Sequence, residues 1–310
     1  MEDKSPEGAP LGPKPTLALS TSMKEKLGEQ LTGMGFTIVD IVYDEETGEP
    51  KIAGDEDVDC LYWSSDIFKR PTSQLNPDEK ERRKIVGREV ILPRIKKWVH
   101  VPSAGLNHWV SIFSKTKLKT SKQTGEDVEG ITLTHSAGVY GLPMGEYCVA
   151  HVLSIAKRIP FHIELQKEHK WKRVDQKSLN NQVLGILGCG GIGLHTARLI
   201  RAFGIRILGT KRSIKEHVLS EDAPADVLSE NERSFVDEWY PGNDESAMLE
   251  VFQRSDFVVC CLPLTPQTTE CITTTHFEAL GEDGWLINVA RGEVIDQDKV
   301  RKMEHNTLSF

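Results

Sequence analysis

The chain has 310 residues, 38% of them hydrophobic, which is enough for two domains with cores of their own. Its 38 lysines and arginines against 46 aspartates and glutamates give a formal net charge of −8, and no basic block is interleaved with aromatic residues. We therefore expect no nucleic-acid partner, and no stretch approaches the roughly 18 apolar residues of a membrane span.

The chain begins with a polar, Pro/Gly-rich segment, residues 1–15, which predicts a disordered lead-in rather than a signal peptide. The six cysteines lack the paired spacing of metal ligands, so no metal site is expected. Buried thiols in a reduced, cytoplasmic protein are the simplest interpretation, with the neighbours Cys260 and Cys261 on opposite faces of a strand.

The first elements predict a β/α beginning. A strand at 16–20 is followed by a helix at 21–35 with a Thr or Ser cap and a glycine stop, and then by a strand at 36–43. The charged stretch 76–101 is interpreted as a solvated helix face without a function.

Residues 142–160 carry apolar side chains around most of a helix, which predicts burial on nearly all sides and a junction between two domains. The polar segment 161–181 that follows predicts an arm or a surface connection.

A glycine loop follows the apolar strand "VLGIL". Gly188, Gly190 and Gly193 have the spacing G-x-G-x-x-G, and a helix with one apolar face follows them. In this context Gly188 permits a tight turn, Gly190 lets a pyrophosphate approach the backbone, and Gly193 lets helix and strand pack closely. The positive end of the helix attracts the phosphate, which makes Gly191 and Ile192 further binding residues. A glycine-rich turn without a ligand is the alternative.

The next strand, "IRILGT", ends where an NAD-binding protein places an acid on the adenosine ribose. Here Lys211, Arg212 and Ser213 follow Thr210, and no carboxylate is present. Two cations with a hydroxyl suit a 2′-phosphate, so we expect NADP(H) to be favoured over NAD(H). The alternative is that both cations are ordinary surface charges.

Two more apolar strands follow, the first ending at Pro263 and the second at Arg291. An arginine between an apolar strand and a glycine, at the carboxyl end where α/β sheets bind ligands, predicts an anion clamp.

With these motifs the sequence resembles the D-isomer-specific 2-hydroxyacid dehydrogenases, which include D-glycerate, glyoxylate/hydroxypyruvate and phosphoglycerate dehydrogenases. The matching segments are "GILGCGGIG", "CLPLTPQTT" and "NVARGEVID", with weaker matches at "VPSAGLNH" and "HSAGVYGLPMGEYCVAHVL". The resemblance extends from about residue 16 to about residue 303.

The resemblance implies an α/β protein with a doubly wound Rossmann dinucleotide domain at 144–310 and a smaller flavodoxin-like α/β substrate domain at 16–143. It places a small 2-oxo or 2-hydroxy acid on the backbone N–H groups of Ala104, Gly105 and Leu106. It places Arg291 on the substrate carbonyl and carboxylate as the catalytic residue. It also implies a homodimer formed through the dinucleotide domain and an arm at about 156–182. It also implies that the cofactor contacts Cys261, Leu262, Pro263, Ala290 and Arg291.

Members of this family carry an acid/base histidine in a "TPH" segment and its glutamate partner in a "DVFxxEP" segment, both downstream of the arginine. Neither segment is found between Arg291 and the final residues "KMEHNTLSF". We therefore expect a family member shortened at its carboxyl end, with strands missing from the Rossmann domain and hydride transfer impaired. Loss of such a proton donor typically costs about 10² to 10⁴ in rate.

No other histidine of the sequence has an acidic partner that matches the family pattern, so none is expected to replace the acid/base histidine. His195 is out of step with the apolar face of its helix, which predicts a solvent-facing side chain. The alternative function is a non-catalytic dinucleotide-binding or redox-sensing interaction protein.

Overall fold

The chain divides between Ala137 and Gly138 into two compact units. Residues 1–13 of the expected lead-in lie outside the described residues, and so does Ser213. The boundaries expected for a substrate domain at 16–143 and a dinucleotide domain at 144–310 remain predictions. The structure, a computed structural model, describes residues 14–47, 49–63, 76–106, 109–113, 118, 130–212 and 234–301.

The first unit is built on a six-stranded sheet in the order β3-β2-β1-β4-β5-β6. All neighbouring strands are parallel except β3, which pairs antiparallel with β2. The carboxyl ends of β5 and β6 therefore meet at one edge of the sheet. The strands are β1 (Thr16–Leu19), β2 (Thr37–Tyr43), β3 (Pro50–Ile52), β4 (Val58–Tyr62), β5 (Ile95–Val101) and β6 (Thr132–His135).

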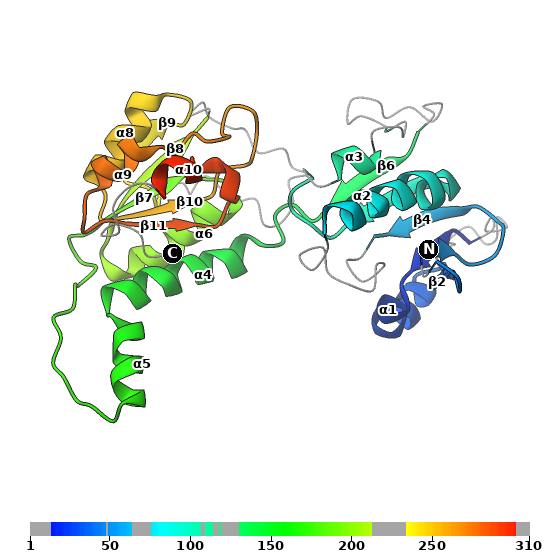
Figure 1. The fold of residues 1–310 in the computed structure, drawn as a ribbon, viewed down its shortest axis with the longest axis horizontal. Helices are drawn as coiled ribbons and strands as arrows, with labels where there is room; N and C mark the ends of the chain where they lie inside the picture. The colour runs from blue at the N-terminus through cyan, green and yellow to red at the C-terminus, as the bar shows by residue number, and fades with distance from the viewer. Residues whose placement is uncertain are drawn as a thin grey trace, which may run out of the picture. The chain divides into compact units, whose positions relative to one another are not determined.

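Helices cover both faces of this sheet. On one face, α1 (Thr21–Gly33) begins where the Ser20 hydroxyl accepts the Met23 N–H at 3.4 Å, and it packs Met23 and Leu31 on the strands. Figure 1 shows α2 and α3 on the face opposite α1.

The charged stretch 76–101 is helical only to Arg94 and then enters the sheet as β5. Its elements are α2 (Pro77–Val86), η3 (Gly87–Ile91) and η4 (Leu92–Arg94), and α3 is Val110–Phe113.

The second unit has a five-stranded, wholly parallel sheet in the order β11-β10-β7-β8-β9. The first strand of this unit, β7, is central: the chain builds outward through β8 and β9 and then crosses to β10 and β11. This is a doubly wound fold, and its order reverses between β7 and β10, where such sheets bind ligands. The strands are β7 (Val183–Leu187), β8 (Arg206–Lys211), β9 (Glu238–Pro241), β10 (Phe257–Cys260) and β11 (Trp285–Asn288).

Helices lie on both faces of the second sheet (Figure 1). The first pair, α4 (Gly141–Ala156) and α6 (Gly191–Ile200), packs on one face, and the second pair, α8 (Glu245–Arg254) and α9 (Thr274–Leu280), packs on the other. Short turns complete the unit: η5 (Arg201–Phe203), η6 (Gly292–Val294) and α10 (Gln297–Val300).

The expected burial of α4 on nearly all sides is wrong for the described residues. The buried side of α4 packs on α6, and a Cβ added to Gly141 or Gly145 would lie 2.7 or 2.9 Å from His195. The opposite side is open, with Tyr147 50% exposed and Leu142 also exposed. Glycine is required where the two helices touch, while the rest of α4 presents apolar side chains outward.

The expectation that His195 faces solvent is also wrong, because its side chain is only 8% exposed. It lies beneath the glycines of α4, and its Nδ1 is 3.2 Å from an Arg198 guanidinium nitrogen. The pattern within α6 could not reveal a second helix packed over this position.

After α4 the chain turns at Arg158, with φ of 49°, into α5 (Ile159–Lys167), which has no buried residue. Figure 1 shows α5 projecting away from the sheet of the second unit. Its Ile159, Phe161 and Ile163 are exposed, and Trp171 in the extended segment that follows is 90% exposed. Within the described chain, no helix is both long and apolar enough to cross a membrane.

Candidate dinucleotide and carboxylate site

The glycine loop after β7 makes two close contacts that exclude side chains. Gly188 has φ of +87°, and a Cβ there would lie 3.2 Å from the Cys261 carbonyl oxygen. A Cβ on Gly193 would lie 2.7 Å from the Gly188 carbonyl oxygen and 2.9 Å from Ile186 Cγ2. The first glycine therefore permits the turn and the third permits close packing of α6 on β7, as the spacing predicts.

The middle of the same loop is open. A Cβ added to Gly190 or Gly191 would meet no atom within 4 Å. Gly190 caps α6 without a side-chain hydrogen bond, and in the described residues the N–H groups of Gly191, Ile192 and Gly193 have no acceptor. Free N–H groups at the positive end of a helix bind phosphate, so these residues fit a dinucleotide pyrophosphate.

Thr210 supports the loop from β8, a role that the sequence analysis missed. Its side chain is buried, its Oγ1 accepts the Gly188 N–H at 2.9 Å, and its carbonyl accepts the Cys189 N–H at 2.9 Å. A hydroxyl at the buried end of an otherwise apolar strand was the available signal. Thr210 therefore holds the glycine loop and does not face a ribose.

The end of β8 carries two cations. Lys211 is half-buried, and its carbonyl accepts the Gly242 N–H at 2.9 Å, while Arg212 is exposed. Burial raises the pKa of the Cys189 thiol in the glycine loop to about 12, and the positive charge of Lys211 opposes that rise. The positive charge of Lys211 thus acts on the loop itself.

The turn after β10 lies against the glycine loop. Cys261 donates its N–H to the Leu187 carbonyl at 2.8 Å, which continues the sheet pairing by one residue. Beyond Leu262, the Thr268 hydroxyl donates to the Pro263 carbonyl at 2.5 Å and accepts the Thr265 N–H at 2.8 Å. These two threonines fix the direction in which the chain leaves the strand.

All six cysteines are free thiols. Cys260 and Cys261 lie in the apolar cores on opposite faces of the sheet, as alternation along a strand predicts. A hydrogen bond between the thiols of Cys148 and Cys261 lowers the pKa of Cys148 and raises that of Cys261. Among the described residues, no three His, Cys, Asp or Glu side chains are grouped to hold a metal ion.

Arg291 lies in the turn after β11, and Asn288 shapes that turn. The Asn288 amide accepts the Ala290 N–H at 3.0 Å and donates to the Arg291 carbonyl at 2.9 Å, a role that the sequence analysis missed. Arg291 donates from Nη1 to the Ala290 carbonyl at 2.7 Å, while its buried Nε has no hydrogen-bond partner among the described residues. A buried donor without an acceptor is costly, so this group fits an anionic or carbonyl ligand.

The first unit carries a loop at 103–106, directly after β5, in which every carbonyl is occupied. The Ser103 carbonyl accepts the Ser136 N–H at 3.2 Å, and the Ala104 carbonyl accepts from His135 Nδ1 at 3.1 Å. The Gly105 carbonyl accepts from the Ser103 hydroxyl at 2.9 Å, and the Leu106 carbonyl accepts the Trp109 N–H at 2.8 Å. In contrast, the N–H groups of Ala104, Gly105 and Leu106 have no acceptor in the described residues. Three successive free N–H groups fit a carboxylate.

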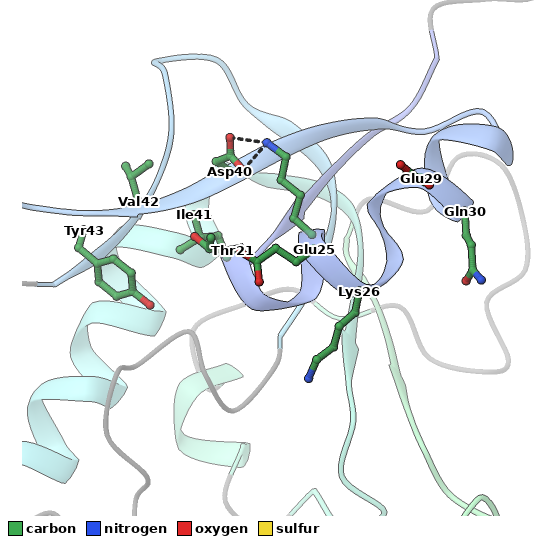
Figure 2. Close-up of a pocket in the computed structure, with 10 residues that line it drawn as sticks. Thr21, Glu25, Lys26, Glu29, Gln30, Asp40, Ile41, Val42 and Tyr43 are labelled. Carbon is green, nitrogen blue, oxygen red and sulfur yellow. Dashed lines mark hydrogen bonds and ion pairs between the residues drawn. The ribbon is translucent and has the colours of Figure 1, made fainter.

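A hollow of about 930 Å³ lies elsewhere in the first unit, between α1 and β2. Lys24 donates to Asp40 across it at 2.8 Å, and Figure 2 shows Lys26 and Gln30 extending away from Asp40. Lys24 and Asp40, whose charges face each other across the hollow, neutralise each other, so the hollow is not included in the candidate site.

Residues 149–307, about half of the chain, match the model of the D-isomer specific 2-hydroxyacid dehydrogenase, NAD binding domain. The chain therefore belongs to the D-isomer specific 2-hydroxyacid dehydrogenase family, as the motifs predicted. The match contains the glycine loop, the turn after β10 and Arg291, so the dinucleotide-binding assignment of this region is confirmed at the level of the domain.

Two plant enzymes illustrate the similarity. The chain is 27% identical over 177 residues to glyoxylate/hydroxypyruvate reductase HPR3 of Arabidopsis thaliana, with 56% of this chain and 48% of that protein covered. It is 26% identical over 175 residues to hydroxyphenylpyruvate reductase of Plectranthus scutellarioides, covering 56% and 49%. The chain thus spans about half the length of these relatives.

Solved structures show the fold. A D-isomer specific 2-hydroxyacid dehydrogenase family protein from Aeromonas salmonicida is 21% identical with a TM-score of 0.64, covering 93% of this chain and 76% of that chain. A D-isomer specific 2-hydroxyacid dehydrogenase from Xanthobacter autotrophicus, solved with NADPH and MES, is 21% identical with a TM-score of 0.60, covering 94% and 76%.

Proposed function

We propose that this chain is an NAD(P)-dependent oxidoreductase that acts on a small 2-oxo or 2-hydroxy acid. The observation that carries the proposal is the buried Nε of Arg291, which has no partner in the described part of the chain and lies at the strand end beside the turn at Cys261. The named relatives reduce glyoxylate, hydroxypyruvate or hydroxyphenylpyruvate, or are phosphoglycerate dehydrogenases.

A bound nicotinamide would supply or accept the hydride, and the accompanying proton would be exchanged between the substrate oxygen and water. In the proposal, Arg291 donates hydrogen bonds to the 2-oxo oxygen and to the carboxylate, and so withdraws electron density from the carbon that is reduced. The N–H groups of Ala104, Gly105 and Leu106 hold the carboxylate. The residues proposed along the cofactor are Gly188, Gly190, Gly191, Ile192, Gly193, Lys211, Arg212, Ser213, Cys261, Leu262, Pro263 and Ala290.

The proposed cofactor preference is NADP(H) over NAD(H), supported by Lys211 and Arg212 at the end of β8. The proposed setting is the cytoplasm, supported by the free thiols throughout the chain. A homodimer through α4, α5 and the following arm is proposed because these segments expose apolar side chains.

The first experiment titrates the purified chain with NADPH and NADH by fluorescence and then adds glyoxylate or hydroxypyruvate. The proposal expects saturable binding followed by oxidation of the nucleotide. Binding without turnover of either acid would favour the non-catalytic dinucleotide-binding alternative, and an absence of binding would overturn both functions.

Charge removal tests the cofactor preference. Lys211→Ala/Arg212→Ala should weaken NADPH binding by about 10-fold or more, since a hydrogen bond to a charged group contributes about 1.5–3 kcal/mol, while NADH binding changes little. Lys26→Ala, an exposed lysine of the first unit, is the control. Equal losses for NADPH and NADH would contradict a 2′-phosphate contact.

A further inference from the structure

The directions of three backbone N–H groups in the 103–106 loop are set by three carbonyl contacts. A trans peptide unit is planar, so the carbonyl of one residue and the N–H of the next point in opposite directions. Whatever holds the carbonyl of Ser103, Ala104 or Gly105 therefore also aims the N–H of Ala104, Gly105 or Leu106, respectively.

The three contacts differ in kind. Ser136 holds the Ser103 carbonyl with a backbone N–H at 3.2 Å, and the Ser103 hydroxyl holds the Gly105 carbonyl from within the loop at 2.9 Å. The Ala104 carbonyl alone is held by a side chain from another strand, that of His135 at the end of β6, with 3.1 Å between Nδ1 and the oxygen. His135 therefore controls the middle N–H of the three, on Gly105.

We infer that His135 is a positioning residue that aims the Gly105 N–H at the substrate carboxylate by holding the Ala104 carbonyl. The inference rests on the proposed function, since it assigns the 103–106 loop to the carboxylate. A carbonyl oxygen can only accept, so the His135 proton lies on Nδ1 in the neutral ring, and protonation at Nε2 leaves the same donor in place.

The surroundings of His135 support its fixed position. His100, on the neighbouring strand, places Nδ1 2.9 Å from the Thr134 hydroxyl and Nε2 3.1 Å from the Ser136 hydroxyl. Its ring stacks on Tyr62 with 5.4 Å between the centroids. The residues on both sides of His135 are therefore tied to β5 by one histidine.

The test uses the full chain with bound NADP(H) and titrates oxalate, a dicarboxylate probe, by calorimetry. His135→Ala should weaken oxalate binding by about 3- to 10-fold, the effect expected from loss of one neutral hydrogen bond. His135→Asn, whose amide nitrogen can replace Nδ1, should restore affinity to within about twofold of wild type. For a turned-over 2-oxo acid, His135→Ala should raise KM and leave kcat unchanged.

The controls separate positioning from folding. Thr132→Ala, an exposed change on the same strand, should leave oxalate affinity unchanged, and all three variants should keep the wild-type melting temperature and NADPH affinity. Oxalate binding to His135→Ala at wild-type strength, or failure of His135→Asn to restore it, overturns the inference alone. Loss of affinity that follows a fall in melting temperature overturns it in favour of a structural role. If the wild-type chain binds NADPH but no oxalate, the proposed substrate site fails and the inference fails with it.

Discussion

Single glycines in the loop after β7 serve two different purposes. Gly188 and Gly193 exclude side chains because backbone atoms already occupy the space, at 3.2 Å from the Cys261 oxygen and 2.7 Å from the Gly188 oxygen, respectively. Gly190 and Gly191 have open space where a Cβ would be. One pair therefore serves the fold, and the other leaves room for a ligand.

This division predicts different effects of one added methyl group. Gly193→Ala should destabilise the second unit by about 1–3 kcal/mol, because the neighbouring atoms are backbone and cannot move aside easily. Gly190→Ala should leave stability within about 0.5 kcal/mol and weaken NADPH binding about tenfold. Urea unfolding and fluorescence titration of both variants check this, and equal stability losses would refute the division.

Buried thiols predict a pH dependence of folding. Burial raises the pKa of Cys189 and of Cys260 to about 12 each, above the ordinary thiol value of 9.0. Only the unfolded chain loses these protons just above pH 9, so the stability that the two thiols contribute should be constant below pH 9 and fall between pH 9 and 12. Urea unfolding from pH 8 to pH 10.5 should show that the free energy of unfolding falls less steeply with pH in Cys189→Ala/Cys260→Ala than in wild type. An equally steep fall in both would show that the two thiols do not cause the pH dependence.

Local constraints made the glycine loop predictable, and distant contacts hid the residues that support it. The spacing of Gly188, Gly190 and Gly193 reports a turn formed within a few residues. Thr210, in contrast, reaches the loop from a strand 22 residues away, and neither residue alone signals the contact. Asn288 acts over only two or three residues, but an asparagine in a turn has many roles.

At the scale of elements, strand β9 is held to its neighbours by a charged group around Glu238. Its carboxylate accepts from Arg254 of α8 at 2.8 and 2.9 Å and from the Tyr240 hydroxyl at 3.1 Å, and it also pairs with Arg206 of β8. Hydrogen bonding to Arg254 is the main cause that lowers the pKa of Glu238 to about 2. The edge strand thus depends on an ionised carboxylate.

Acid should therefore loosen β9. The contribution of Glu238 is present above its unfolded pKa, near 4.5, and is lost as the pH falls toward 2. Glu238→Gln should flatten the pH dependence of stability over this window, while Glu278→Gln, an exposed change on α9, should not. Thermal unfolding between pH 5 and pH 2.5 measures the melting temperature of each variant. Parallel curves of melting temperature against pH for wild type and Glu238→Gln would show that ionised Glu238 does not stabilise β9.

Helix α4 shows why apolar content alone misled the sequence analysis. Its apolar residues surround the helix, yet among the residues that the structure describes only the side that carries Gly145, Cys148 and Val152 is buried. A residue pattern measures how apolar a surface is and does not say whether the covering surface belongs to the same chain. The outward side of α4 is exposed, as is α5, in which no residue is buried.

At the scale of the whole molecule, the exposed sides of α4 and α5 predict self-association. The double variant Phe161→Asp/Ile163→Asp should shift the chain toward the monomer, because two desolvated carboxylates at an apolar contact are costly. Sedimentation at several concentrations measures the change, with Glu164→Gln on the same helix as the control. A wild-type chain that is monomeric at high concentration would contradict the proposed dimer.

The doubly wound order of the second unit was predictable from the alternation of strands and helices together with the family resemblance. The glycine loop identified β7, and parallel pairing then placed the following strands on its two sides. The close packing of α4 on α6, including the burial of His195, was not predictable, because it depends on two glycines matched to another helix.

The order of the second sheet also has a consequence for synthesis of the chain. Val183 begins the central strand, and its N–H donates to the carboxylate of Asp256, 73 residues later, at 2.8 Å. On a ribosome that adds about 5–20 residues per second, one edge of β7 therefore stays open for several seconds. During that time the apolar strand "VLGIL" is available to a chaperone or to another nascent chain, which makes the arrival of β10 the step that ends this exposure.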